Sequence, residues 1–201
     1  YVNTVNHSFV LDDFSVIAEN KMTTAGRDSL GTIFKNGYRE GNYSTEDNLY
    51  RPLTKAMFAI EYDLSGGKEY FDQQDGQPKL MHWINVLLYG FLCAFIFLTL
   101  RKFFPDNYYA VLIASLLFAF HPLHTEVVAN IKSRDEILTL IFLLASLRCA
   151  WNYIQAKTGG YLMMALAGGT YFLALLTKES AITYVVLLPV SLWFITKGSG
   201  Q

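Results

Sequence analysis

The sequence predicts an all-α polytopic membrane protein with about five transmembrane helices and a first loop, residues 1–79, outside the membrane. Hydrophobic residues make up 52% of the 201 residues, but they are unevenly distributed. Residues 1–79 have the composition of a soluble segment, whereas residues 80–196 do not. The longest uncharged run, Leu80–Leu100, has 21 residues. This matches the ~20 residues that a helix needs to cross ~30 Å of hydrocarbon.

Four further crossings are predicted after this helix. Tyr161–Thr177 and Ser180–Thr196 have 17 residues each, the lower limit for a span, and each ends beside a Lys that can reach the interface. Tyr108–Phe120 and Ile137–Leu147 are shorter, so flanking polar residues must complete them. The predicted spans within the bundle, residues 80–197, lie near residues 80–100, 108–125, 137–154, 161–177 and 180–196.

The Lys and Arg residues predict the orientation of these helices. Five crossings place alternate loops on opposite sides, and an excess of Lys and Arg marks the cytoplasmic side. The residues that share this side are Arg101, Lys102, Arg148, Lys157 and Lys197. We therefore expect residues 1–79 and the passage His121–Glu136 to share the other side. That side is the periplasm for a bacterial inner membrane, or the lumen for the endoplasmic reticulum.

Two helices are expected within the first loop. After Arg51-Pro52, apolar residues recur at helical spacing, and Gly66-Gly67 follow as a stop signal. These apolar residues are Leu53, Ala56, Met57, Ile60 and Leu64. The pattern predicts an amphipathic helix lying along the membrane surface. A shorter helix is expected after Asp28-Ser29, whose side chains can cap it.

The passage His121–Glu136 carries seven ionisable side chains in sixteen residues. Because one charge at the bilayer centre costs ~2.5–3.5 kcal/mol, this passage must lie at a membrane face or line a wet cavity. One interpretation is a divalent metal site formed by His121, His124 and Glu126. Their spacing does not match the HExxH arrangement, and Pro122 breaks a helix between the two His. We expect a polar hydrogen-bonded network here, with no metal or other cofactor.

Adjacent carboxylates at Asp12-Asp13 could act as a general base. Neighbouring carboxylates disfavour joint ionisation, and partial burial raises the pKa of one of them further. A carboxylate with a raised pKa can accept a proton from a hydroxyl. The alternative interpretation is a solvated turn or a helix cap. Only the surrounding residues can distinguish the two.

Two cationic side chains lie near predicted membrane faces. The guanidinium of Arg51 could hold a phosphate through two hydrogen bonds, or it could anchor a lipid headgroup or form a salt bridge. Lys178 could neutralise a lipid phosphate as a point charge, or it could pair with Glu179. His82 and Asn85 occupy the first turn of the first span. They could face a cavity or satisfy backbone groups.

Other features exclude or leave open several classes of protein. Cys93 and Cys149 lie within apolar runs, which favours packing over a disulfide or a metal pair. The net charge of −1 and the absence of a basic stripe give no support to nucleic-acid binding. The chain starts at Tyr1 without a signal-like segment. We therefore expect an N-terminal fragment that lacks at least one membrane anchor.

An ordered set of motifs resembles one family. The motifs are Asp12-Asp13, Tyr50-Arg51-Pro52-Leu53, His82-x-x-Asn85, the HPLHTE segment within Leu117–Glu126, Arg134-x-Glu136 and Lys178-Glu179. Together they resemble the transmembrane O-mannosyltransferases that carry tetratricopeptide repeats. These belong to the dolichyl-phosphate-mannose protein mannosyltransferase superfamily of glycosyltransferase fold type C. The HPLHTE segment is the most specific element.

The resemblance implies a glycosyltransferase. It would move a sugar, mannose in this family, from a polyprenyl-phosphate carrier to a Ser/Thr or glycan hydroxyl with inversion. Asp13 or Asp12 would take the proton of the acceptor. The groups implied to bind the donor phosphate are Arg51, Lys178 and Arg134. Glu136 or Asp135 would form an acidic site in the second loop, and the implied polar lining of the cavity is His121, His124, Glu126, His82 and Asn85.

Two positions limit this comparison. Tyr89 stands where the family commonly has His, and both Asp135 and Glu136 stay candidates for the second-loop acid. Among other classes, a transporter would place ionisable groups near the bilayer midplane, whereas these charges gather at span ends. This difference favours the enzyme. A non-catalytic membrane scaffold of the same fold is the remaining alternative.

Overall fold

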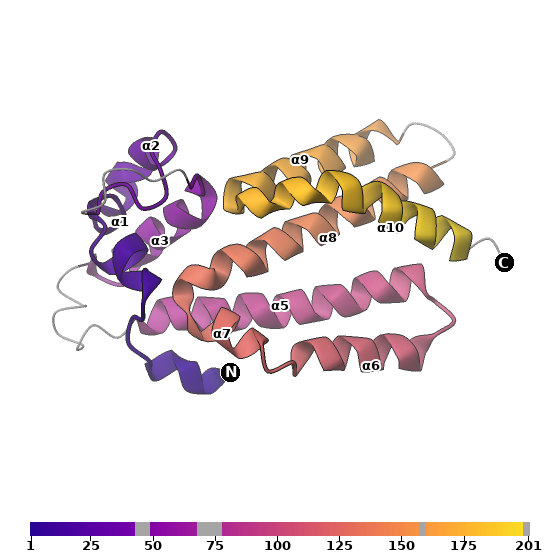
Figure 1. The fold of residues 1–201 in the computed structure, drawn as a ribbon, viewed down its shortest axis with the longest axis horizontal. Coiled ribbons are helices and arrows are strands. Elements are labelled where there is room, and N and C mark those ends of the chain that lie inside the picture. Colours follow the sequence, from indigo (N-terminus) through magenta and orange to yellow (C-terminus); the bar gives the residue numbers. More distant parts are fainter. Residues whose placement is uncertain (43–48, 68–77, 157–159, 199–201) are drawn as a thin grey trace.

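The computed structural model describes residues 1–42, 49–67, 78–156 and 160–198. In these residues every regular element is a helix, and an isolated bridge pairs Glu40 with Asn42. The predicted all-α class is confirmed. Figure 1 shows two parts: a layer of short helices at one end, and longer helices that extend away from it.

The layer is formed by residues within 1–42 and 49–67. Its helices are η1 (Val2–Asn6), the π-helix η2 (Phe14–Ala18), α1 (Lys21–Thr24), η3 (Gly26–Ser29), α2 (Leu30–Ile33) and α3 (Pro52–Leu64). Val16, Ile17 and Phe58 of this layer are fully buried, and they pack in one cluster with Met81 and Ile131 of the helical bundle. The layer is therefore fastened to the bundle by a shared hydrophobic core.

Helix α3 begins at Pro52, as the sequence predicts, but it is buried on more than one face. Thr54, Lys55 and Glu61 are buried, in addition to apolar residues such as Phe58. The ammonium of Lys55 donates to backbone carbonyls of Gly37 and Glu40, at 3.2 and 2.7 Å. A single apolar stripe does not describe this helix, because buried polar contacts hold its other face inside the layer.

The predicted helix after Ser29 is present as α2, but its predicted cap is wrong. The Ser29 side chain makes no capping hydrogen bond to α2. Its hydroxyl donates instead to the backbone carbonyl of Gly26, at 2.7 Å. The hydroxyl also lies 2.5 Å from the Met22 carbonyl, so its contacts orient it toward the preceding turn and away from the amides of α2.

The bundle follows the layer. Its elements are α5 (Lys79–Phe103), α6 (Tyr108–Ala119), α7 (His124–Ala129), η4 (Ile131–Ser133), α8 (Arg134–Gln155), α9 (Tyr161–Thr177), η5 (Glu179–Thr183) and α10 (Tyr184–Gly198). In the described parts of the chain, three stretches are long and apolar enough to cross a membrane: Lys79–Phe103, Ile131–Gln155 and Glu179–Lys197. Helices α6 and α9 are apolar but shorter. The finding supports an integral membrane protein, and the count of five crossings stays a prediction.

The second predicted span, near residues 108–125, is interrupted. Helix α6 ends at Ala119, and the chain resumes as α7 at His124. The last carbonyls of α6 are used by side chains: the Tyr89 hydroxyl donates to Ala119, at 3.1 Å, and His124 Nδ1 lies 2.8 Å from the Phe118 oxygen. These side chains, together with the His121 amide 3.2 Å from the Phe118 oxygen, take the place of the N–H that Pro122 lacks.

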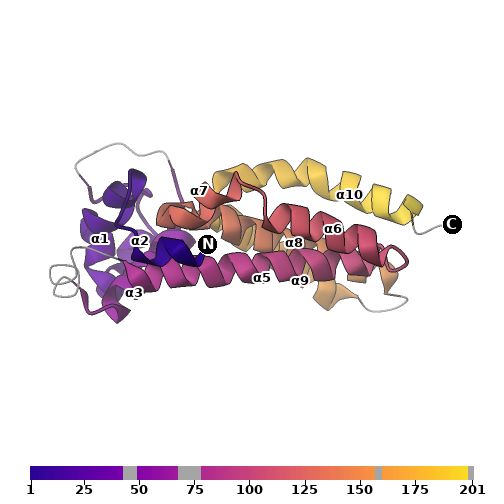
Figure 2. The same cartoon turned by 90° about the horizontal axis from the view of Figure 1, so that it is seen from below.

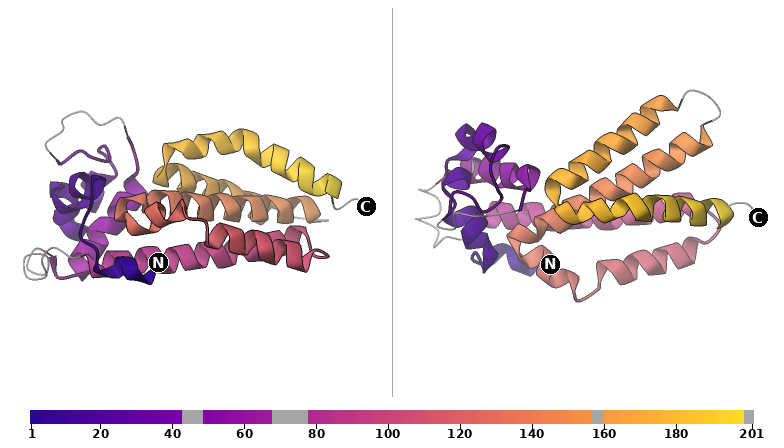
Figure 3. Two further views of the ribbon diagram at one scale, coloured as in Figure 1. Left: turned by 60° about the horizontal axis from the view of Figure 1, so that its bottom comes forward. Right: turned by 45° about the horizontal axis from the view of Figure 1, so that its top comes forward.

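The helices alternate in direction, so the layer lies beside the start of α5, the start of α8 and the end of α9 (Figures 1 and 2). Figure 3 shows α8 and α9 side by side as an antiparallel pair. Arg101 and Lys102 are in the last turn of α5, and Lys197 is in the last turn of α10. These basic residues therefore lie at the end away from the layer. Lys157, which was expected beside them, lies outside the described residues.

Candidate active site

Charged side chains of the two predicted loops meet where the layer contacts the bundle, and we call this region the junction. Arg51 precedes α3 and donates to two carboxylates. Its Nη1 bonds to Asp135, and its Nε and Nη2 both bond to Glu179, with an Nε–Oε2 distance of 2.8 Å. Arg51 and Asp135 are buried, whereas the Glu179 side chain is 50% exposed. Arg51 thus fastens the layer to both α8 and η5.

Lys178 forms an ion pair with Glu136, and not with its neighbour Glu179. The Lys178 side chain is 17% exposed and that of Glu136 is 49% exposed, so this pair lies at the edge of the junction. Both candidates for the second-loop acid therefore belong to the junction. Asp135 occupies its interior, and Glu136 occupies its rim.

Asp13 connects the layer directly to the second loop. Its carboxylate is buried and accepts backbone N–H bonds from Lys132, at 2.7 Å, and from Val10, at 3.2 Å. Burial raises the pKa of Asp13 above its ordinary value, and the amide donors oppose this change. The negative charge of Asp12 raises the pKa too, but it is a smaller cause than burial. The sequence thus predicted the direction correctly, with burial as the larger of its two reasons.

The two adjacent carboxylates have different surroundings. The Asp12 side chain is 44% exposed and pairs with Arg39, at 3.2 Å, and with Lys132, at 3.3 Å. The preceding Leu11 has a φ of 46°, in the left-handed region that residues other than glycine seldom adopt. This turn lets one carboxylate enter the protein and leaves the other at its surface.

Arg134 is completely enclosed by the protein. Its guanidinium donates to Asn85 Oδ1, at 2.6 Å, to Glu61, and to the Met81 carbonyl, at 3.0 Å, and it lies 4.8 Å from the Phe58 ring centre. Burial raises the pKa of Glu61, and Arg134 opposes that change. With its donors used in this way, Arg134 has no face open to a ligand. Its implied contact with the donor phosphate does not fit this geometry.

His82 and Asn85 also face protein groups. Asn85 Nδ2 lies 3.3 Å from the Asn130 carbonyl and 3.4 Å from that of Val128, and His82 Nε2 lies 3.1 Å from the His7 carbonyl. Both side chains are fully buried. Of the two interpretations that the sequence left open, the structure supports satisfaction of backbone groups.

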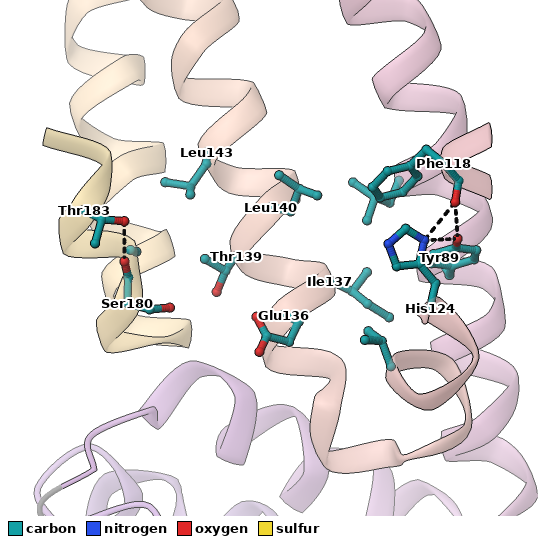
Figure 4. A pocket seen from close by; sticks show the side chains of 13 residues that line it. Tyr89, Phe118, His124, Glu136, Ile137, Thr139, Leu140, Leu143, Ser180 and Thr183 are labelled. Carbon is teal, nitrogen blue, oxygen red and sulfur yellow. Dashed lines mark hydrogen bonds between the residues drawn. The ribbon is translucent and has the colours of Figure 1, made fainter. Parts of the chain in front are cut away.

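The HPLHTE segment contributes one residue to a cavity of about 400 Å³ between the helices. His124 lines this cavity together with Glu136 and Ser180, as Figure 4 shows. His121 and Glu126 are exposed and are not among its lining residues. In the part of the chain that the structure describes, no group of three or more His, Cys, Asp or Glu side chains could hold a metal ion.

No sequence pattern selects Tyr38, which is fully buried at the junction. The Arg51 guanidinium lies 5.3 Å from its ring centre, and its hydroxyl has no hydrogen-bond partner among the described residues. Burial and the charge of Asp135 both raise the pKa of this hydroxyl. Tyr38 lies in a segment without helical periodicity, so only its contacts distinguish it.

The fold and the junction together define an integral membrane protein whose extramembrane layer meets the bundle through buried ion pairs. Comparison with known proteins gives the family. The chain is 34% identical to protein O-mannosyl-transferase TMTC3 of Homo sapiens over 98% of its length. It is 33% identical to Tmtc1 of Drosophila melanogaster and 30% identical to TMTC4 of Mus musculus, each over 93% of its length.

The chain is thus a homologue of part of the protein O-mannosyl-transferases, which confirms the resemblance to transmembrane O-mannosyltransferases. It spans 21%, 20% and 27% of the length of these three relatives. No protein-family model and no solved structure matches the chain.

Proposed function

We propose that this chain supplies the reacting groups of a membrane O-mannosyltransferase. The enzyme would transfer mannose from a polyprenyl-phosphate carrier to a hydroxyl of a protein or glycan acceptor. The observation that carries the proposal is the convergence of Asp13, Arg51, Asp135 and the Glu136–Lys178 pair, from separate segments, at one junction. The relatives are named protein O-mannosyl-transferases, which supports transfer of mannose.

Asp13 is the proposed general base. Its raised pKa makes its carboxylate a stronger proton acceptor than an ordinary Asp. The Asp13 side chain is fully buried in this structure, so the layer would have to open near Val10 to admit the acceptor, whose hydroxyl would then give its proton to Asp13 while its oxygen attacks the anomeric carbon. The bond from that carbon to the phosphate oxygen breaks on the opposite face, so the configuration inverts and the lipid phosphate leaves. Asp12, which is 44% exposed and pairs with Arg39 and Lys132, is the alternative base.

Arg51 and Lys178 are the proposed partners of the departing phosphate. Each of them pairs with a half-exposed carboxylate, Glu179 and Glu136 respectively. A phosphate can take the place of these exposed partners, while buried Asp135 keeps Arg51 in position. Cations held in place before the reaction stabilise the negative charge that develops on the leaving group.

The proposed site faces away from the cytoplasm. The basic residues Arg101, Lys102 and Lys197 lie at the opposite end of the bundle, which the positive-inside rule assigns to the cytoplasm. The proposal includes five crossings, in which α6 and α9 span with the help of flanking residues. Donor and acceptor would then meet on the periplasmic or luminal side.

The test is sugar transfer by the full-length protein reconstituted with polyprenyl-phosphate mannose and an acceptor. Asp13→Asn is expected to lower kcat by about 10²- to 10⁴-fold, the range of general base catalysis. Glu19→Gln, a matched change of an exposed carboxylate in the same layer, should keep normal turnover. Thermal unfolding midpoints of both variants control for misfolding.

Two results would contradict the proposal in different ways. Normal turnover by Asp13→Asn would remove Asp13 as the base, and Asp12→Asn would then be the variant to measure. If the folded wild-type protein transfers no mannose from any polyprenyl-phosphate donor, the enzymatic function itself is wrong and a membrane scaffold is the better description.

A further inference from the structure

The cavity beside the junction combines apolar walls with a few polar groups. Helix α8 contributes Ile137 and Leu140, which Figure 4 shows between the side of His124 and the side of Ser180. Glu136 also lines the cavity while its carboxylate pairs with Lys178. Glu136 therefore lies between the cavity and Lys178, which is a proposed partner of the phosphate.

The contacts of His124 determine which of its nitrogens carries hydrogen. Nδ1 lies 2.8 Å from the Phe118 carbonyl oxygen, which can only accept a hydrogen bond. Nδ1 must therefore be the donor, and in the neutral ring Nε2 is left as an acceptor. The Tyr89 hydroxyl, 3.0 Å from Nδ1 and bonded to the Ala119 carbonyl, holds the ring in this orientation.

The acceptor nitrogen of His124 faces the cavity. In Figure 4 the second ring nitrogen points away from Tyr89 and Phe118, toward the side where Leu140 lies. None of the described residues makes a hydrogen bond to Nε2, and this atom is not among the enclosed polar atoms of the described residues. A hydrogen-bond donor of a bound molecule can therefore reach it.

The chemistry of the lining selects the kind of molecule. His124 Nε2 and the Glu136 carboxylate are both acceptors, so they favour a ligand with several donors and disfavour an anion. A sugar ring fits this description, because its hydroxyls donate and its C–H faces can pack against Ile137 and Leu140. A sugar joined to a phosphate at Lys178 would lie beside Glu136, at the edge of this cavity.

We propose that the cavity binds the ring of the transferred sugar and that His124 Nε2 accepts a hydrogen bond from one of its hydroxyls. This inference rests on the proposed function and adds a residue that recognises the sugar. His124 is a binding residue here, since it touches the substrate away from the bond that breaks. Tyr89 and Phe118 act through it as positioning groups.

Two substitutions separate the roles of the two ring nitrogens. His124→Asn keeps an amide near Nδ1 that can donate to the Phe118 carbonyl, but it places nothing at Nε2. His124→Gln extends an amide oxygen toward the cavity. With polyprenyl-phosphate mannose, His124→Asn should lower kcat/KM about three- to tenfold, the size expected for one neutral hydrogen bond. His124→Gln should recover most of this loss.

Deoxy donors identify the partner of His124. Wild-type protein should lose a similar factor with one monodeoxy-mannose donor, and His124→Asn should lose nothing further with that donor. If His124→Asn equals wild type with every donor, the proposal is overturned. It is also overturned if the loss in His124→Asn is the same for all deoxy donors, because the substitution then acts without a sugar contact.

A binding measurement keeps this inference separate from the proposed function. Short-chain polyprenyl phosphate with mannose should raise the thermal unfolding midpoint of wild type more than the same lipid without sugar. In His124→Asn the two lipids should be equivalent. If wild type transfers no mannose but shows this difference, the proposed function fails and the sugar site stands. Equal stabilisation of wild type by both lipids overturns the site.

Discussion

Charged side chains have different surroundings at the two ends of the bundle. At the junction, Arg51 and Arg134 are buried, and each pairs with a carboxylate from another segment. At the far end, the Arg101 guanidinium bonds to the neighbouring Pro105 carbonyl, at 2.7 Å, and lies 5.1 Å from the Tyr108 ring centre. Lys102 at this end is exposed.

The difference shows what each set of charges can contribute. Removing a charge from water costs several kcal/mol, so the junction can hold buried cations only where partners and hydrogen bonds compensate. Cations at the far end stay hydrated, and they mainly determine the orientation of the protein in the membrane. Loss of one partner should therefore be severe at the junction and mild at the far end.

The largest effect is expected for Arg134→Met. This change leaves the buried Glu61 carboxylate without its cation, and breaking a buried pair in this way costs about 3–5 kcal/mol. Chemical or thermal unfolding of the detergent-purified protein measures it. The double variant Arg134→Met, Glu61→Met should recover part of the loss. A loss below about 1 kcal/mol would mean that the enclosed pair is no more important than a surface pair.

An intermediate effect is expected from pH. The pKa of Asp13 is raised in the folded protein, so its contribution to stability is complete below the unfolded pKa, ordinarily 3.8, and is lost as pH rises through the folded value. The slope for one such group is at most ~1.4 kcal/mol per pH unit. Unfolding measured above pH 3.8 should show a shallower decline for Asp13→Asn than for wild type. Parallel curves would show that Asp13 titrates normally.

The smallest effect is expected for Arg101→Met at the far end. The change removes one backbone hydrogen bond and one cation–π contact near the surface, which together contribute about 1 kcal/mol or less. The same unfolding assay provides the measurement and serves as the control for Arg134→Met. If both variants lose the same stability, the two ends do not differ in the way proposed here.

The fold could be predicted well where the signal is local. An uncharged run of membrane length gave α5, and Pro52 with helical periodicity gave the start of α3. The apolar run alone did not give the end of α6, because Pro122 lacks the N–H that would continue the helix, and Tyr89 and His124 bond to its last carbonyls from outside the helix. Ser29 is at the N-cap position of α2 as the sequence suggests, yet its hydroxyl is oriented toward the Gly26 carbonyl of the preceding turn.

Sequence motifs named several charged residues of the junction, but they did not show how these residues pair. Lys178 and Glu179 are neighbours, but each pairs with a partner from another segment. The sequence cannot show this exchange of ion-pair partners, because the partners are determined by how α3, α8 and η5 meet in space. For the same reason, Glu61 and Tyr38 carried no recognisable signal, although both are buried at the junction.

The ion pair between Arg51 and Glu179 has a consequence for biosynthesis. The two residues are 128 positions apart, and a ribosome that adds ~5–20 residues per second needs roughly 6–26 s to make the interval. Until then, the Arg51 guanidinium of the nascent layer lacks its partner Glu179. Its docking must follow insertion of the helices that bring Asp135 and Glu179, so the layer is synthesised before these helices but reaches its final form after them.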